Sequence, residues 1–269
     1  MTPTHPDPVR VLVIRTVGTN CDRETCRGFE LAGAACDLVH LHALIDDPSP
    51  IERAGVIALP GGFSYGDDVA SGRVQAMWMR EHLLGHLRRA VDRGVPILGI
   101  CNGFQVLVQL GLLPGGGGSF RQTTALTHNA GARFIDVWSE LSPAPGSRCV
   151  WTTGLERRPH EPALAFPNGH GEGRFVAPPA VLDDLESRGL VALRYAADIN
   201  GSERAIAGIC DESGLVFGLM PHPDRFLDWN RHPAWTRLPA EAFARETPGV
   251  RLFRNGVEAA LGSLSARPG

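Results

Sequence analysis

Short apolar runs alternate with amphipathic segments in the first part of the chain. The runs are rich in valine, isoleucine and leucine, as in strands that are buried on both faces of a parallel sheet. The segments between them repeat apolar residues at helical spacing and end near glycines. We predict strands over Val9–Ile14, Cys36–Leu41, Gly55–Leu59 and Val95–Ile100, and helices over Asp22–Leu31, Met77–Val91 and Phe104–Leu110. This alternation favours a parallel α/β sheet that is covered by helices.

Beyond Pro114 the pattern changes to strands that are separated by turns. We predict strands over 134–138, 148–152, 191–195, 205–210 and 216–219, and a helix in pieces over 239–264 that is interrupted at 247–249. The turn residues Asp211–Gly214 indicate a hairpin between the last two strands. Because no clean linker interrupts the chain, we expect one domain over residues 1–269, with a mixed sheet.

Composition and charge exclude several classes of function. Of the residues, 43% are hydrophobic and 20% are charged, and the formal net charge is −3. A nucleic-acid surface needs a broad basic stripe, so neither nucleic acid nor an anionic membrane is an expected partner. No run approaches the roughly 18 apolar residues of a membrane helix, and the polar, proline-rich start does not resemble a signal peptide. We therefore expect a cytoplasmic protein.

The six cysteines, at positions 21, 26, 36, 101, 149 and 210, are spread along the chain. This spacing differs from the dense disulfide framework of a small secreted domain. Cys21 and Cys26 would suit half of a metal site, but no second C-x-x-C or H-x-x-x-H partner follows. We therefore predict no metal site, and we expect most thiols to be small core residues.

Cys101 is the exception, because it lies in the segment Gly99-Ile100-Cys101-Asn102-Gly103 between a predicted strand and a predicted helix. A tight strand-to-helix turn pushes its central side chain outward, and flanking glycines let the neighbouring backbone pass. The helix N-terminus stabilises a thiolate. By itself, the pattern also fits a buried cysteine in a turn; the context favours a nucleophile.

A thiolate nucleophile needs a base and a group that orients the base. Met220-Pro221-His222-Pro223-Asp224 offers both two residues apart, and in an extended segment such side chains point the same way. The alternative is that Asp224 caps the following segment and His222 is a surface turn residue.

Two glycine-rich segments complete the candidate site. Pro60–Asp67 follows a strand, at the sheet edge where α/β proteins bind ligands, and its glycines can present N–H groups to an oxyanion. The second segment, Asn168–Gly173, carries His170 and Glu172. His170 and Glu172 could form an acid–base pair in place of His222 and Asp224, or bind a metal. The other interpretations are that they position a substrate or shape a tight turn.

Together these segments resemble the glutamine amidotransferase subunits of phosphoribosylformylglycinamidine synthases, which belong to purine biosynthesis. The matching stretches run in the family's order over nearly the whole chain: GTNCD (18–22), LPGGFSYGDD (59–68), GICNGFQVLVQLGLLPG (99–115), HGEGRFV (170–176), INGS (199–202), IAGI (206–209) and GLMPHPDR (218–225). The G-x-C-x-G-x-Q turn is shared by class I amidotransferases in general. The motifs PGGFSYGD, HGEG and MPHP are more specific and point to the formylglycinamidine branch.

The resemblance implies a flavodoxin-like class I glutamine amidotransferase domain, with a mixed, mostly parallel sheet flanked by helices. It implies that Cys101 is the nucleophile, that His222 is its base and later acid, and that Asp224 orients His222. The other residues that it implies are Gly62 and Asn102 for the oxyanion N–H groups, and Phe63, Gln105, His170, Gly171 and Glu172 for holding glutamine.

The same resemblance implies the partners. Ammonia from L-glutamine would pass to a large synthetase subunit that binds ATP and Mg²⁺, and a small accessory subunit accompanies the pair in many bacteria. This chain carries no ATP motif, and we expect no cofactor on it.

Two departures from the family pattern affect these expectations. Asp224 stands where the family has glutamate, and a carboxylate that falls short by about 1 Å can lower a rate roughly 10²-fold. The segments Gly115–Thr127 and Trp229–Pro248 are longer than the family requires. They would be either partner contacts or lineage-specific surface.

Two alternative functions stay open. One is another class I amidotransferase or a free-standing hydrolase of γ-glutamyl substrates; the other is an inactive subunit that only binds glutamine.

Overall fold

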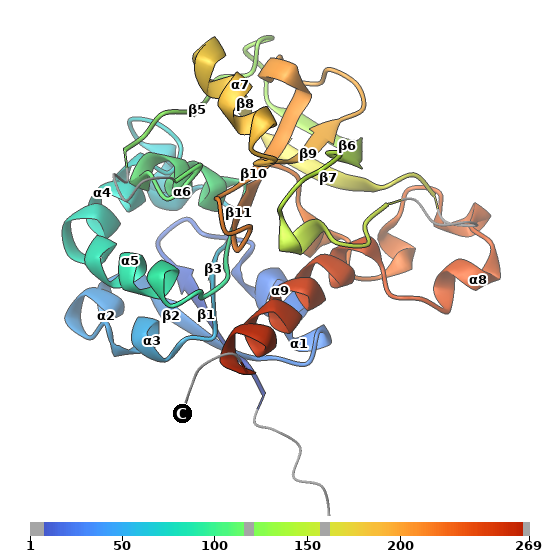
Figure 1. Ribbon diagram of the computed structural model, residues 1–269. Coiled ribbons are helices and arrows are strands. Elements are labelled where there is room, and N and C mark those ends of the chain that lie inside the picture. Colours follow the sequence, from blue (N-terminus) through green and yellow to red (C-terminus); the bar gives the residue numbers. More distant parts are fainter. Residues whose placement is uncertain (1–7, 116–120, 157–161, 266–269) are drawn as a thin grey trace, which may run out of the picture.

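The computed structural model describes residues 8–115, 121–156 and 162–265. Within them, a nine-stranded sheet joins both halves of the chain in the order β2-β1-β3-β4-β11-β10-β9-β6-β7 (Figure 1). Its strands are β1 (Arg10–Arg15), β2 (Ala35–His40), β3 (Val56–Leu59), β4 (Ile97–Ile100), β6 (Ile135–Pro143), β7 (Ala165–His170), β9 (Val191–Tyr195), β10 (Ile206–Cys210) and β11 (Val216–Leu219). A separate antiparallel pair is formed by β5 (Ala125–Thr127) and β8 (Arg174–Val176).

The sheet is parallel in its first half and antiparallel in its second. Strands β2, β1, β3, β4 and β11 pair in parallel, whereas β10, β9, β6 and β7 continue the sheet with antiparallel pairing. The apolar runs explain the parallel half, because side chains such as Val11, Val13 and Ile14 in β1 are fully buried. The predicted mixed sheet and the predicted β10–β11 hairpin are confirmed.

Helices cover both faces of the parallel half (Figure 1). Helices α1 (Asp22–Leu31) and α9 (Pro248–Ser265) pack together on one face, where the rings of Phe29 and Phe253 meet with centroids 4.8 Å apart. The opposite face carries α2 (Leu41–Asp46), α3 (Ser49–Arg53), α4 (Arg73–His82), α5 (Leu84–Asp92) and α6 (Asn102–Leu110). Among the described residues, every helix is too short or too polar to span a membrane.

Several predicted elements differ from the structure. The predicted helix over 77–91 is two helices, α4 and α5, which meet at the buried residue Leu83, where φ is −118° and ψ is −9°. The predicted strand over 148–152 is wrong: Val150–Thr152 is a 3₁₀ turn, whose buried Trp151 donates to the Leu215 carbonyl. Helix α7 (Pro179–Ser187) was not predicted.

The two long segments are described to different extents. Residues 116–120 of the segment 115–127 lie outside the described residues. The segment 229–248 folds into the short helical turns Trp229–Arg231 and Trp235–Arg237 and helix α8 (Ala240–Phe243). The predicted break near Pro248 is confirmed, because α9 begins there.

The glycines around Cys101 are required by close packing. A Cβ on Gly103 would stand 2.0 Å from the carbonyl oxygen of Leu59 in β3. We expect Gly103→Ala to lower the free energy of unfolding by about 3 kcal/mol, because overpacking forces β3 and α6 apart. Urea unfolding measures this loss. Gly131→Ala is the matched control, since a Cβ there meets nothing within 4 Å; equal stability of the two variants would contradict the packing argument.

Candidate active site

Cys101 occupies a strained turn between β4 and α6. Its backbone has φ 52° and ψ −106°, a conformation that costs on the order of 1–3 kcal/mol for a residue with a Cβ. Surrounding bonds hold it: the Cys101 N–H donates to the Leu219 carbonyl at 2.7 Å, and the Cys101 carbonyl accepts from Gln105 at 3.1 Å. The sulfur lies 3.8 Å from the carbonyl oxygen of Gly169 on β7. The predicted strand–turn–helix setting is confirmed.

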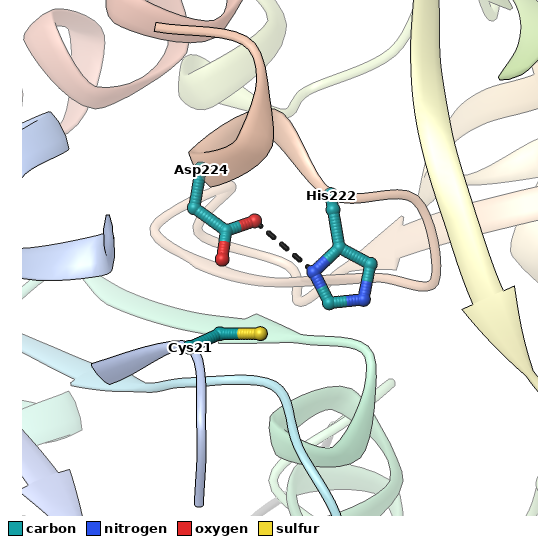
Figure 2. A group of neighbouring side chains, drawn as sticks. All are labelled: Cys21, His222 and Asp224. Atoms are coloured by element: carbon teal, nitrogen blue, oxygen red, sulfur yellow. Dashed lines mark hydrogen bonds and ion pairs between the residues drawn. The ribbon is translucent and has the colours of Figure 1, made fainter. Parts of the chain in front are cut away.

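His222 and Asp224 follow β11 and lie together in the interior. The His222 Nδ1 atom is 3.1 Å from Asp224 Oδ1, and each residue is only 1% exposed (Figure 2). The expectation of an extended segment here is wrong, because Pro223–Arg225 forms a 3₁₀ turn. This turn brings the carboxylate to the ring, so the short aspartate side chain reaches hydrogen-bonding distance.

The groups around His222 favour its charged form. Burial opposes the charge, but the Asp224 carboxylate and the Cys101 sulfur outweigh burial and raise the pKa of His222 well above its ordinary value. Gly61 leaves room for the ring, since a Cβ there would stand 2.6 Å from His222 Cε1 and 3.4 Å from Cys101 Cβ. The Nε2 atom forms no hydrogen bond with any described residue, so it is available to a reacting group.

The side chain of Asn102 ties the nucleophile turn to the loop after β3. Its Oδ1 accepts from the Ser64 N–H at 3.4 Å, and its Nδ2 donates to Asp67 Oδ1 and Gln105 Oε1, both at 3.1 Å. Burial raises the pKa of Asp67 above its ordinary value. The sequence did not single out Asp67 as part of the site, although Asp67 is the last residue of the PGGFSYGD motif.

The two groups proposed to bind the oxyanion lie on either side of this junction. Gly62 has φ 137°, and a Cβ there would stand 2.6 Å from the Asn20 backbone nitrogen, so only glycine fits. The Asn102 N–H is at the first turn of α6, where N–H groups lack partners within the helix. Asn102 is thus the chain neighbour of Cys101, and Gly62 follows Gly61, where an added Cβ would stand 3.4 Å from Cys101 Cβ.

The side chains of His170 and Glu172 diverge. His170 Nδ1 lies 3.2 Å from Asn129 Oδ1, whereas Glu172 Oε2 accepts from the Ser71 N–H at 3.2 Å. Of the described residues, neither belongs to a group that is able to hold a metal ion. This geometry gives no support to a His170–Glu172 acid–base pair or to their use as metal ligands.

The remaining residues implied for glutamine binding have different surroundings. Gln105 is 3% exposed, and its Nε2 donates to the Glu172 carbonyl at 2.5 Å, so it supports the loop from within. Gly171 contributes its carbonyl to the N–H of Asn129 at 2.9 Å. Phe63 is 41% exposed. Asn129 was not predicted from the sequence, and no motif pointed to it.

The burial of His170 makes stability depend on pH. Burial, with a further contribution from the charge of His222, lowers the pKa of His170 to about 4, whereas an unfolded histidine titrates near 6.5. Between these values only the unfolded chain binds the proton, so the free energy of unfolding falls as the pH drops from about 6.5 to about 4, by up to about 3 kcal/mol.

We expect His170→Gln to be less sensitive to acid than the unmodified protein over that range. Urea unfolding of both proteins at pH 7.5 and 4.5 isolates the contribution of His170 from that of other groups. Identical losses in the two proteins would show that His170 is protonated in the folded state.

Comparison with known proteins identifies relatives over nearly the whole chain. A family model described as the CobB/CobQ-like glutamine amidotransferase domain matches residues 8–258. The phosphoribosylformylglycinamidine synthase subunit PurQ of Dehalococcoides mccartyi is 42% identical over 257 residues, which cover 93% of this chain and 97% of that protein. The protein of the same description from Methanococcus maripaludis is 36% identical over 270 residues, with 93% and 96% covered.

A solved structure agrees with these sequence comparisons. A chain in the structure of PurLQS from Thermotoga maritima superposes with a TM-score of 0.71 and is 33% identical. The match covers 96% of this chain and 99% of that one. The similarity therefore includes the parallel half of the sheet, its antiparallel continuation and the loops that carry the candidate site.

Proposed function

The chain belongs to the PurQ family of glutamine amidotransferases, and from that membership we propose how its residues divide the work of the site. It is the glutaminase subunit of phosphoribosylformylglycinamidine synthase, which acts in purine biosynthesis. One observation carries the assignment of residues: the strained turn holds Cys101 beside the buried His222, whose Nδ1 is 3.1 Å from Asp224 Oδ1.

In this proposal, the Cys101 thiolate attacks the side-chain amide carbon of glutamine. The carbon–sulfur bond forms as the carbonyl π electrons move to oxygen, and the N–H groups of Gly62 and Asn102 stabilise that oxyanion. His222 gives its Nε2 proton to the departing nitrogen, the carbon–nitrogen bond breaks, and ammonia leaves. Water then attacks the thioester, giving a proton back to His222, and glutamate and the thiolate are released.

Asp224 orients the imidazole and favours its charged form, so it acts through His222 and not on glutamine. Phe63 and the loop of His170, Gly171 and Glu172 surround the substrate, and Gln105 supports this loop. The support for these roles is the pair of hydrogen bonds that anchor Glu172, one through its side chain and one through its carbonyl.

Ammonia then passes to a synthetase partner, and we assign ATP and Mg²⁺ to that partner. The structure of PurLQS from Thermotoga maritima supports such an assembly for this chain. A small accessory subunit and a cytoplasmic location complete the proposal.

Co-purification with the large subunit, followed by assay of glutamine-dependent synthesis, tests the proposed function. A chain that hydrolyses glutamine at full rate alone would instead favour a free-standing hydrolase.

The partner has an apolar surface to bind, which we call the apolar rim. It consists of four exposed hydrophobic side chains on loops around the site: Val17 (65% exposed), Phe63 (41%), Val69 (90%) and Phe134 (56%). The rings of Phe63 and Phe134 lie 6.3 Å apart, and the Tyr65 N–H bonds the Val17 carbonyl. Clustered apolar side chains at the mouth of a site indicate an interface.

We expect Val69→Asp to weaken binding of the synthetase partner by about 10- to 100-fold, because a charge buried within an apolar interface is left without a partner. Aspartate tolerates the left-handed backbone at this position, φ 70°, better than valine does, so folding is preserved. Analytical ultracentrifugation or interferometry with the purified large subunit measures the effect.

The control is Leu261→Asp, which places the same charge on a side chain that is 43% exposed near the end of α9. Figure 1 shows this end of α9 at the edge of the sheet where β1 begins, opposite the carboxyl ends of the parallel strands. Unchanged binding by Val69→Asp, or equal weakening by both variants, would contradict docking on the apolar rim.

A further inference from the structure

Cys21 has no part in the proposed reaction, yet it lies against the His222–Asp224 pair. It precedes α1, and it is 1% exposed. Its sulfur, a ring nitrogen of His222 and a carboxylate oxygen of Asp224 all lie within 4.8 Å of one another (Figure 2). We propose that these three side chains form a zinc site that inhibits the glutaminase, an inference that rests on the proposed role of His222.

The three donors are of the kinds that Zn²⁺ takes in proteins: thiolate, imidazole and carboxylate. In a tetrahedral zinc site with protein bond lengths, neighbouring ligand atoms are about 3.5 Å apart. The widest separation in this group therefore has to close by about 1 Å, which side-chain rotation supplies. Three protein ligands leave the fourth position of the ion for water.

An unsatisfied carboxylate oxygen points to a ligand at this place. Asp224 uses Oδ1 for the contact with His222, but its buried Oδ2 accepts no hydrogen bond from any described residue. In Figure 2 this second oxygen is directed toward Cys21, and Nδ1 is the ring nitrogen on the same side. A buried anionic oxygen without a partner is costly, and a cation between the oxygen and the sulfur removes that cost.

A cavity of about 590 Å³ leads to Cys21 and Asp224 from outside. Cys21, Asp224 and Arg225 are among the residues that line it. Cys101 is not among the described residues that line this cavity, so an ion reaches the site without crossing the glutamine pocket. Arg225 Nη2 donates to Cys21 Sγ at 3.2 Å, and such an N–H···S bond also suits a metal-bound thiolate.

Binding has a defined chemical consequence for catalysis. The Cys21 thiol releases its proton to solvent as the sulfur–zinc bond forms. His222, starting as the imidazolium, releases its Nδ1 proton to solvent, binds the ion through that nitrogen and keeps the proton on Nε2. The ring is then fixed as the Nε2–H tautomer, which cannot accept the proton of the attacking water.

The first test measures binding without activity. Cys101→Ala protein is titrated with Co²⁺, and we expect one equivalent to produce a thiolate-to-cobalt charge-transfer band. Adding Cys21→Ser should remove the band, whereas adding Cys26→Ser, the matched thiol on α1, should keep it. A band that survives Cys21→Ser, or that requires Cys101, would overturn the zinc site. Since no turnover is measured, this result is independent of the proposed function.

The second test measures inhibition in the complete complex. We expect Zn²⁺ to lower kcat for glutamine hydrolysis with KM unchanged, and EDTA to reverse the effect. Cys21→Ser should raise the half-inhibiting Zn²⁺ concentration about 100-fold or more, since even groups that only support metal ligands contribute about 10- to 100-fold to affinity. Inhibition that glutamine relieves, or that Cys21→Ser leaves unchanged, would contradict the proposal.

Discussion

Replacing Cys101 with alanine is expected to lower glutamine-dependent synthesis by the complex by about 10⁴-fold or more, while ammonia-dependent synthesis continues. The reason is that the thioester cannot form without the sulfur, whereas added ammonia needs only the synthetase partner. Product formation from each nitrogen source, measured with the same preparation of the complex, gives both rates. The strained backbone at Cys101 tolerates alanine no worse than cysteine, so the fold is preserved.

Cys26→Ser is the control for general effects of losing a thiol. Cys26 is half-buried on α1 and takes no part in the proposed reaction, so both activities should persist. A glutamine-analogue electrophile should label Cys101 in the unmodified protein and fail to label the alanine variant. Equal loss of both synthetic activities in Cys101→Ala would show that the residue supports the assembly and not the release of ammonia.

Asp224→Asn is expected to have the next largest effect, a fall in kcat of about 10³-fold, because an amide offers the wrong hydrogen-bond pattern to Nδ1. KM should change little, since Asp224 contacts His222 and not the substrate in the proposed mechanism. Removing the carboxylate also removes one cause of the raised pKa of His222. The limb of the pH–rate profile that reports this histidine should therefore move to lower pH.

Asp224→Glu is the matched variant, since it keeps the charge and adds one methylene. We expect its kcat to stay within about 10-fold of the unmodified enzyme, because glutamate keeps both the charge beside His222 and the oxygens that accept from Nδ1. A large fall with glutamate would show that the turn Pro223–Arg225 is built around aspartate. Near-normal activity with asparagine would mean that Asp224 does not orient the base.

The local pattern of the chain was sufficient for most elements of the parallel half. The predicted bounds of α1 and β11 agree with the structure, as do those of β9 in the antiparallel half, because apolar periodicity and terminal glycines act within a few residues. The strand predicted over 148–152 failed for a different reason. Trp151 is apolar in sequence but packs end-on against Gly256 and Phe29, and this contact with α1 and α9 makes a turn more favourable than a strand.

The sequence by itself determined Cys101 and its strand–turn–helix setting, since the apolar run before it, the flanking glycines and the start of the helix all lie within a few residues. Only the tertiary structure decided what surrounds the sulfur. The turn at Pro223–Arg225 brings Asp224 to His222, and a hydrogen bond connects Asp67 to Asn102. The fold also places Cys21 close to His222 and Asp224, some two hundred residues away in the sequence. Such contacts follow from how β1, β3, β4 and β11 align their carboxyl ends at one edge of the sheet, which no spacing along the chain encodes.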